Sequence, residues 1–171
     1  MVDYREIYRE AFRDPKYCSE PNAPRYHFAK DCFRRWGVKT IMDIGAGRHH
    51  LRDILGDDFI YHSTNVDTHL GDFDLTKPHS DVFGKWQAVA CLDVLEHLEQ
   101  NKVGIAIDNL RYASKRAVIC VSNHSSVPHG VELHLTQQDG DWWEKQIGRR
   151  FDIVDKDLSH PRSYFYQCEH K

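Results

Sequence analysis

Apolar and polar residues follow two different periods along this chain, one typical of helices and one typical of buried strands. Helical spacing covers residues 3–13 and continues from Pro24 to Trp36, where Gly37 is a natural stop. Short apolar runs predict strands at residues 40–45, 59–66, 86–93, 116–122, 151–155 and 163–169. Further helices are predicted at residues 49–55, at residues 99–113 and around Trp142 and Trp143.

Because strands and helices alternate, we predict an α/β fold with a mostly parallel sheet. Residues 1–171 are expected to form a single domain, with no repeat or linker that divides it. Within it, residues 1–37 are expected to be an N-terminal helical cap, and residues 38–171 a Rossmann-like core with helices on both faces of the sheet. The short connection His160-Pro-Arg predicts an antiparallel hairpin between the last two strands.

The composition narrows the class of protein further. Of the 171 residues 40% are hydrophobic and 29% charged, and the net charge is −3, so no global basic surface favours nucleic acid. No apolar run approaches the roughly 18 residues that span a bilayer, and the N-terminus lacks a signal-peptide core. The five cysteines have no CxxC spacing, which favours buried free thiols in a reducing compartment. We therefore expect a cytoplasmic protein without a membrane partner.

The first candidate site is a glycine turn after the strand at residues 40–45. Asp43, Gly45, Ala46 and Gly47 stand where an open α/β sheet usually binds a nucleotide-like ligand. A dinucleotide fingerprint needs a third glycine, but His50 occupies that position. The turn therefore favours a ligand without a pyrophosphate. Its other interpretation is a plain connection between a strand and a helix.

Three acids follow the second predicted strand. Asp67 ends that strand and is placed to accept hydrogen bonds from ribose hydroxyls. Asp72 and Asp74 come next, near the expected position of an adenine ring, where one of them would bond the amino group. The alternative is structural for all three: a solvated loop aspartate at Asp67, and a turn with a capping aspartate at the other two.

The third feature is the segment Cys91-Leu-Asp-Val-Leu-Glu-His-Leu98. Together with the glycine turn, the second-strand acid and Gly71-Asp-Phe-Asp-Leu75, it follows the order seen in class I S-adenosylmethionine-dependent methyltransferases. The segment is similar to one in ubiquinone-biosynthesis O-methyltransferases and in small-RNA 3′-end 2′-O-methyltransferases. The resemblance covers roughly residues 37–158 and implies a seven-stranded sheet whose last strand is antiparallel.

The resemblance also implies roles for individual residues. Asp43, Gly45, Ala46 and Gly47 would line the methionine part of S-adenosylmethionine. Asp67 would hold the ribose, Asp72 or Asp74 the adenine, and Asp93 would lie beside the reacting methyl group. The segment between Asp67 and Gly71 is too short for the usual helix, so the chain resembles a trimmed version of the family.

Histidines suggest a second candidate cofactor, a divalent metal ion. A helical turn over residues 93–97 would place Asp93, Glu96 and His97 on one face. Small-RNA methyltransferases are similar in using this turn with a later histidine, which corresponds to His134, and we predict Glu96, His97 and His134 as metal ligands. Many methyltransferases carry the same turn without a metal, so the alternative is that these side chains pack or face the acceptor.

The resulting hypothesis is methyl transfer to an oxygen or nitrogen of a small-molecule or nucleoside-like acceptor. Asp93, His97, His129 and His134 are the candidate catalytic residues, because an acceptor needs a base with a pKa near neutrality. Three alternatives stay open: a metal-dependent RNA-end 2′-O-methyltransferase, a nicotinamide-dependent oxidoreductase, and a binding module that has lost catalysis.

Overall fold

A computed structural model describes residues 4–17, 20–64, 74–77 and 86–171 of the chain. The helices are α1 (Tyr4–Arg13), α2 (Pro24–Trp36), α3 (His50–Leu55), α4 (Val103–Ala113) and α5 (Gly140–Ile147). The strands are β1 (Thr40–Ile44), β2 (Ile60–Thr64), β3 (Ala88–Leu92), β4 (Arg116–Ser122), β5 (Phe151–Asp157) and β6 (Ser163–His170). Short 3₁₀ turns at Gly56–Asp58, Leu95–His97, Gln100–Lys102 and Pro128–Gly130 join some of them.

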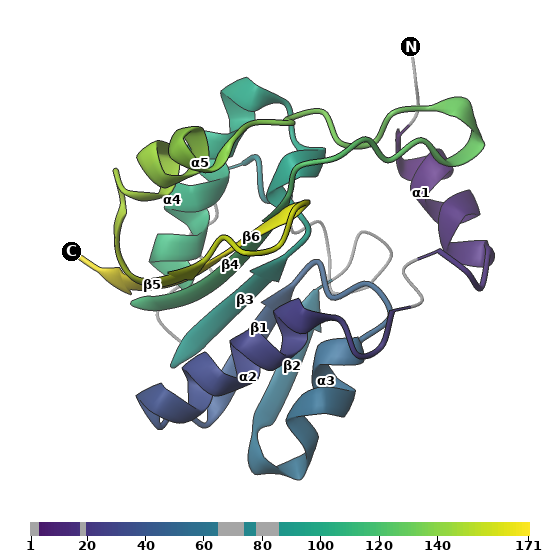
Figure 1. Ribbon diagram of the computed structural model, residues 1–171. Helices are drawn as coiled ribbons and strands as arrows, with labels where there is room; N and C mark the ends of the chain where they lie inside the picture. Colours follow the sequence, from purple (N-terminus) through teal and green to yellow (C-terminus); the bar gives the residue numbers. More distant parts are fainter. Residues whose placement is uncertain (1–3, 18–19, 65–73, 78–85) are drawn as a thin grey trace.

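The sheet has the order β2-β1-β3-β4-β6-β5 (Figure 1). Strands β1 to β4 are parallel to their neighbours, whereas β6 lies antiparallel between β4 and β5. The predicted α/β class and the antiparallel last strand are therefore confirmed. The sheet of the described residues has six strands, so the expected seventh is not confirmed.

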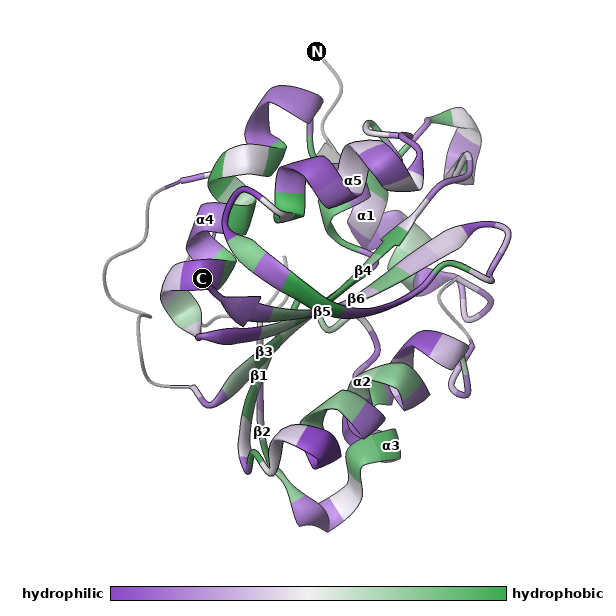
Figure 2. Cartoon of the chain, turned by 60° about the vertical axis from the view of Figure 1, so that its left-hand side comes forward, coloured by the Kyte–Doolittle hydropathy of each residue, from purple (hydrophilic) through white to green (hydrophobic). Residues whose placement is uncertain are grey.

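Helices cover both faces of the sheet, and the alternation of side chains along the central strands explains why. In β1, Met42 and Ile44 pack toward α4 and α5, whereas Ile41 packs toward α2 and α3. Strand β3 is buried along its whole length, as a near-continuous apolar strand requires when both faces are covered. Figure 2 shows the two helical layers, with hydrophobic residues turned toward the sheet.

The boundaries of α2 follow from its sequence. Pro24 occupies the first turn, where its missing N–H costs no hydrogen bond, and Gly37 ends the helix in the left-handed conformation with φ of 63°. Helix α2 packs in the layer that covers the sheet, through Ala29, Cys32 and Phe33. Helix α1 lies apart from this layer, at the end toward which the parallel strands run (Figure 1). The two helices that were assigned to an N-terminal cap thus have different surroundings.

Two further expectations concern the whole chain. Cys32, Cys91, Cys120 and Cys168 are buried free thiols, as the lack of CxxC spacing indicated. Among the helices of the described residues, none has the length and apolar character needed to cross a membrane.

Gly45, directly after β1, provides a test of this packing. Its φ is +76°, and a Cβ placed on it would lie 2.5 Å from Cγ2 of Val94. We expect Gly45→Ala to lower the free energy of unfolding by about 1–2 kcal/mol for the left-handed backbone and by about 1–3 kcal/mol more for overpacking. Denaturant unfolding measures this loss.

Gly37→Ala is the matched control, because Gly37 has a similar φ of +63° and no atom within 4 Å of an added Cβ. It should show the backbone cost alone. In a Val94→Ala background the cost of Gly45→Ala should fall toward that of the control. Equal losses for both glycines in the wild-type background would contradict the steric argument.

Candidate functional site

The glycine turn joins the end of β1 to α3. Gly45 and Gly47 both have positive φ, 76° and 54°, so the chain reverses without a Cβ on either residue. The amides of Gly45 and Ala46 both donate to the carbonyl oxygen of Thr64 at 3.0 Å, which ties the turn to the end of β2. His49 is left-handed as well, with φ of 60°, and α3 begins directly after it. The turn therefore lies at the carboxyl end of the central strands, where open α/β sheets bind ligands.

Helix α1 is fastened to this turn by Arg48. Its guanidinium and Nε donate to the carbonyl oxygens of Phe12, Asp14 and Tyr17 at 2.9, 2.6 and 2.8 Å. The carbonyl of Phe12 belongs to the last turn of α1 and those of Asp14 and Tyr17 follow it, so Arg48 lies at the C-terminal end of the helix, where a cation is favoured. The ring of Phe12 lies 3.7 Å from the position that a Cβ on Gly47 would take. Helix α1 thus covers the glycine turn from outside the sheet.

Asp43 lies one strand residue before the turn and is 3% exposed. The hydroxyl of Tyr61, on β2, donates to its Oδ2 at 2.7 Å. Burial raises the pKa of Asp43 to about 7, and the hydrogen bond from Tyr61 offsets only part of that shift. The group can therefore change its charge near neutral pH, at the position where the resemblance places the methionine part of a cationic cofactor.

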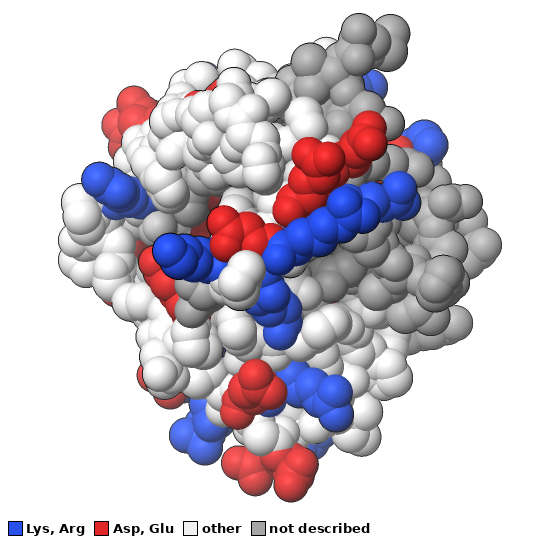
Figure 3. Space-filling view, turned by 90° about the vertical axis from the view of Figure 1, so that its right-hand side faces the viewer, with Lys and Arg blue, Asp and Glu red and all other residues white. Residues whose placement is uncertain are grey.

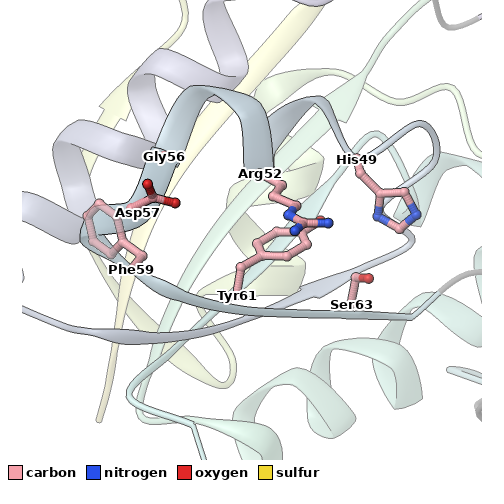
Figure 4. A pocket seen from close by; sticks show the side chains of 7 residues that line it. All are labelled: His49, Arg52, Gly56, Asp57, Phe59, Tyr61 and Ser63. Atoms are coloured by element: carbon pink, nitrogen blue, oxygen red, sulfur yellow. The ribbon is translucent and has the colours of Figure 1, made fainter.

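A cavity of about 350 Å³ opens between α3 and β2 (Figure 4). His49 and Ser63 line the end next to the glycine turn, Asp57 and Phe59 the other end, and Arg52 and Tyr61 the middle. A second cavity, of about 660 Å³, is lined by Trp86, Arg111 and Arg116, among others, at the opposite ends of the strands. Asp93 lines neither of these two cavities, so we infer the position of the acceptor from the chemistry of the described side chains.

Asp93 begins the turn after β3 and has an unusual backbone, with φ of 56°. Its Oδ1 accepts from the hydroxyl of Ser122 and the thiol of Cys120, both at 3.1 Å. Its Oδ2 lies 2.9 Å from Nε of Arg25, in an ion pair whose N–H is not well directed for a hydrogen bond. Burial opposes the charge of Arg25, but Asp93 raises the pKa of Arg25 above its ordinary value, so the guanidinium stays charged.

The expected helical face of Asp93, Glu96 and His97 is therefore wrong for Asp93. The chain forms a 3₁₀ turn only from Leu95 to His97, and the left-handed Asp93 precedes it. A left-handed residue at the start does not continue the helical spacing on which the shared face depended. The carboxylate of Asp93 bonds to the ends of β4 and α2 instead.

Glu96, His97 and His134 do come together, as the sequence predicted. One ligand atom from each lies within 4.8 Å of the other two. Glu96 is fully buried; its Oε1 accepts from the amide of Ser122 at 2.9 Å, whereas its Oε2 has no partner among the described residues. A buried carboxylate oxygen without a partner is costly unless a proton or a cation occupies it.

The two histidines have the orientation that a metal ligand needs. Nδ1 of His97 lies 3.0 Å from the carbonyl oxygen of Leu133, and Nδ1 of His134 lies 2.6 Å from that of His124. Since a carbonyl oxygen can only accept, each Nδ1 carries the hydrogen and each Nε2 keeps its lone pair. Such backbone bonds are the usual support of metal-bound imidazoles, so these residues fit a divalent metal ion.

The charges of this cluster also fit a cation. Burial raises the pKa of Glu96 well above its usual value, and Asp93 adds to that shift. Burial lowers the pKa of His97 to about 4, with His134 contributing, and it lowers the pKa of His134 as well. Without an ion, burial thus favours the neutral form of the carboxyl and of both imidazoles. A bound cation would favour the ionised form of the Glu96 carboxyl.

Glu132 and Tyr8 hold the cluster from outside. Oε1 of Glu132 accepts from the amides of Ser126 and His134, both at 2.8 Å. These bonds and one from Ser125 lower the pKa of Glu132 to about 2, although desolvation opposes them. The hydroxyl oxygen of Tyr8, on α1, lies 2.5 Å from Nδ1 of His97. The N–H at this Nδ1 is therefore shared between the hydroxyl oxygen of Tyr8 and the carbonyl oxygen of Leu133. Helix α1 thus contacts both the glycine turn and the histidine cluster.

The remaining predicted site residues lie elsewhere. His129 is exposed in the turn Pro128–Gly130 and is not one of the three clustered residues. Asp67 and Asp72 lie outside the described residues. Asp74 is described: its Oδ1 accepts from the amide and hydroxyl of Thr76 at 2.9 and 2.6 Å, and Oδ2 lies 3.2 Å from Nζ of Lys77. That is the capping turn given as the alternative for Asp74.

Figure 3 shows the end of the molecule that faces right in Figure 1. Acidic and basic side chains lie next to one another over the described part of this surface, and they do not form a continuous basic area. A long nucleic-acid backbone requires many aligned cations. The surface is better suited to a small ligand that reaches the strand ends than to an extended duplex.

Comparisons with known proteins agree with this geometry. No protein-family model matches the chain, and no curated protein is similar to it in sequence. Among solved structures, 1,6-didemethyltoxoflavin-N1-methyltransferase from Burkholderia thailandensis, with bound S-adenosylhomocysteine, superposes with a TM-score of 0.78 at 11% identity, over 98% of this chain and 87% of that one. The chain has the fold of the S-adenosylmethionine-dependent methyltransferases.

Two further structures support this methyltransferase fold. The N-methyltransferase NodS from Bradyrhizobium japonicum has a TM-score of 0.64 at 10% identity, over 98% of this chain and 97% of that one. The methyltransferase domain of bacterial-CtHen1-C has a TM-score of 0.65 at 13% identity, over 88% and 98%.

Sequence reasoning missed several residues of the site. Arg25 was missed because it lies far from Asp93 along the chain, and only the packing of α2 brings them together. Tyr61 was missed because a tyrosine in an edge strand is ordinarily a packing residue. Its spacing could have been informative: Tyr61 pairs with Ile41 in the register of β1 with β2, and Ile41 lies two residues before Asp43, on the same face of the sheet.

The raised pKa of Asp43 gives a prediction for stability. Its ordinary value is 3.8 and its folded value about 7, so between these the folded state binds more protons and the free energy of unfolding falls as pH rises. Asp43→Asn removes this effect and keeps an acceptor for Tyr61. Relative to wild type, the variant should gain on the order of 4 kcal/mol in unfolding free energy from pH 4 to pH 8.

Urea unfolding of both proteins across this pH range makes the measurement. Comparing the two proteins at each pH cancels the titration of His97, whose lowered pKa acts in the opposite direction. A difference that does not change with pH would show that Asp43 ionises normally.

Proposed function

We propose that the protein transfers a methyl group from S-adenosylmethionine to an oxygen or nitrogen of a small-molecule or nucleoside-like acceptor. The observation that carries this proposal is the coincidence of three features at one end of the sheet. The chain has the methyltransferase fold, and in this fold the left-handed glycine turn and the fixed carboxylate of Asp93 both lie where the parallel strands end. A non-catalytic binding module would not need an array of buried titratable groups beside that edge.

The cofactor roles follow from these positions. We assign Asp43, Gly45, Ala46 and Gly47 to the methionine part, with the charge of Asp43 available to its ammonium group near neutral pH. Asp67 is assigned to the ribose. For the adenine, Asp72 is favoured over Asp74, because the carboxylate of Asp74 already bonds Thr76 and Lys77.

For methyl transfer, the protein has to align the acceptor with the methyl group and remove a proton from the acceptor. The acceptor atom forms a bond to the methyl carbon as the sulfur–carbon bond breaks, and the proton of the acceptor has to leave. Asp93 would position the acceptor beside the methyl group. His134 or His97 would take the proton through Nε2, which is neutral and unprotonated; His129 is a weaker candidate because it is exposed. Helix α1, which covers the turn, would exclude water.

A second candidate is a metal-dependent methyltransferase that acts on the 2′-hydroxyl at an RNA end. The unpartnered Oε2 of Glu96 between His97 and His134 favours it. These three residues would hold the ion, which would lower the pKa of an acceptor hydroxyl. Only the terminal nucleotide needs to reach the site, so the mixed charges in Figure 3 do not oppose it.

Two further parts of the proposal concern the whole protein. Four buried, unpaired thiols support a cytoplasmic location, where such thiols stay reduced. The resemblance supports a sheet of seven strands, one more than the six strands of the described residues. Neither part affects the assignment of the site.

Cofactor binding tests the main proposal directly. Calorimetry should show that S-adenosylmethionine binds and that a nicotinamide dinucleotide does not. Asp67→Ala should weaken binding of S-adenosylmethionine by about 1.5–3 kcal/mol, because it removes hydrogen bonds to a charged acceptor. Asp58→Ala, which changes an exposed acid near β2, is the control. Unchanged affinity in Asp67→Ala would remove the ribose assignment, and tight nicotinamide binding would overturn the function.

Transfer from methyl-labelled S-adenosylmethionine separates the two candidates. If the ion takes part, a chelator should abolish transfer, and Glu96→Gln and His134→Ala should lower it at least tenfold, since a lost ligand costs at least as much as a lost supporting bond. His129→Ala changes a histidine outside the cluster and should retain methyl transfer. A loss of transfer in this variant would identify His129 as the base. Transfer to short RNA ends but not to small phenols or amines would favour the second candidate. Transfer indifferent to the chelator would exclude a metal role.

A further inference from the structure

The carboxylate of Asp93 lies next to the cluster of Glu96, His97 and His134 but does not belong to it. It is close enough to raise the pKa of Glu96 and to influence both imidazoles. Yet it is not one of the residues whose ligand atoms converge within 4.8 Å. Helical spacing led us to expect Asp93 on the same face as Glu96 and His97, so its absence from the group needs a physical cause.

The cause is that both oxygens of Asp93 are occupied. The hydroxyl of Ser122 and the thiol of Cys120 take Oδ1, and Arg25 takes Oδ2. Ser122 and Cys120 are on β4 and Arg25 is in the first turn of α2, so three separate contacts hold the side chain in place.

Arg25 is itself fixed. Its side chain is 17% exposed, and its guanidinium lies 4.6 Å from the ring centre of Tyr26. Nη2 also donates to the hydroxyl of Tyr26 at 3.2 Å. Withdrawing the carboxylate would leave this mostly buried guanidinium with the exposed carboxylate of Glu20, 3.9 Å from Nη1, as its remaining ion-pair partner. Removing the buried partner is more costly than breaking an exposed pair. The ion pair therefore keeps Asp93 out of the cluster under ordinary conditions.

What remains is a donor set of two imidazole nitrogens and one carboxylate oxygen. Mg²⁺ prefers oxygen ligands and keeps its water, whereas imidazole suits first-row transition ions. We propose that Arg25 withholds Asp93 from the cluster and thereby makes it a three-ligand centre for a borderline divalent ion, of the Mn²⁺, Fe²⁺, Co²⁺ or Zn²⁺ class, in preference to Mg²⁺. This inference rests on the metal-binding candidate above. Arg25 is a positioning residue, since it acts on the ion through Asp93.

The test compares Co²⁺ and Mg²⁺ binding to the full chain without any acceptor. Visible absorption measures Co²⁺ binding and reports its ligand environment, and competition gives the affinity for Mg²⁺. Wild type should prefer Co²⁺ by at least about 100-fold, as its nitrogen donors and the general order of divalent affinities predict. Asp93→Asn keeps all three ligands and should lower Co²⁺ affinity clearly less than Glu96→Gln, which removes a ligand and should lower it by roughly tenfold or more.

Arg25→Met frees the carboxylate, so Asp93 can join the cluster as a second oxygen ligand. The Co²⁺ to Mg²⁺ preference should then narrow by roughly tenfold, with a changed absorption spectrum. The double variant Arg25→Met with Asp93→Asn should return to the wild-type ratio, and Arg25→Lys should keep it. Arg34→Met, on the same helix but in an exposed pair with Asp58, is the matched control and should leave the ratio unchanged.

Three outcomes would overturn the inference: no Co²⁺ binding by wild type, an equal loss in Asp93→Asn and Glu96→Gln, or an unchanged ratio in Arg25→Met. If Arg25→Met does not fold, as circular dichroism would show, the comparison of Asp93→Asn with Glu96→Gln decides alone. Calorimetry with S-adenosylmethionine on the same preparations separates this result from the proposed function. If the protein shows the expected metal preference but does not bind S-adenosylmethionine, the proposed function is overturned and the inference about Arg25 stands.

Discussion

The buried carboxyl of Glu96 is the constraint on which the site depends. Its side chain accepts from the amide of Ser122 at the end of β4, and its backbone carbonyl accepts from the amide of Thr136 at 2.9 Å. One residue thus fixes the turn after β3, the end of β4 and the segment that carries His134. A fully buried carboxyl costs several kcal/mol of folding free energy unless it is neutral or paired. Its Oε2, which has no partner among the described residues, would be stabilised by a proton or by the cation that we propose.

The sequence predicted the elements well because the sheet has both faces covered. Uninterrupted apolar runs such as 88–92 and 116–122 occur where strands are buried on both sides, and glycine and proline mark the ends of α2. The turn after β3 was harder. A helical spacing from Asp93 assumes right-handed backbone, and the left-handed φ at Asp93 depends on contacts with β4 and α2 that no local pattern records.

The same distinction separates the site residues that were predicted from those that were not. Glu96, His97 and His134 carry metal-ligand chemistry in their side chains, so residue type and a family resemblance were enough to select them. Arg25 and Tyr61 act through the fold, on Asp93 and Asp43. Each contacts a site residue that is distant in sequence, at a separation set by how α2 and β2 pack. Their types are common on any surface, so only the packing distinguishes them.

The position of Asp93 also explains how one edge of a sheet can hold two kinds of chemistry. Strand alternation places Asp43 on the side of α2 and α3, with Tyr61, whereas Glu96 and the histidines lie beyond β3 and β4 beneath α1. Asp93 stands between these groups, and its ion pair with Arg25 anchors it to the layer of α2. A carboxylate held there can face an acceptor without competing for the ion. The charge of Arg25 also offsets that of Asp93 beside Glu96, which lowers the repulsion that a second anion would create. The ion pair is therefore what allows the fixed carboxylate of Asp93 and the buried carboxyl of Glu96, our proposed metal ligand, to occupy neighbouring positions at one end of the sheet.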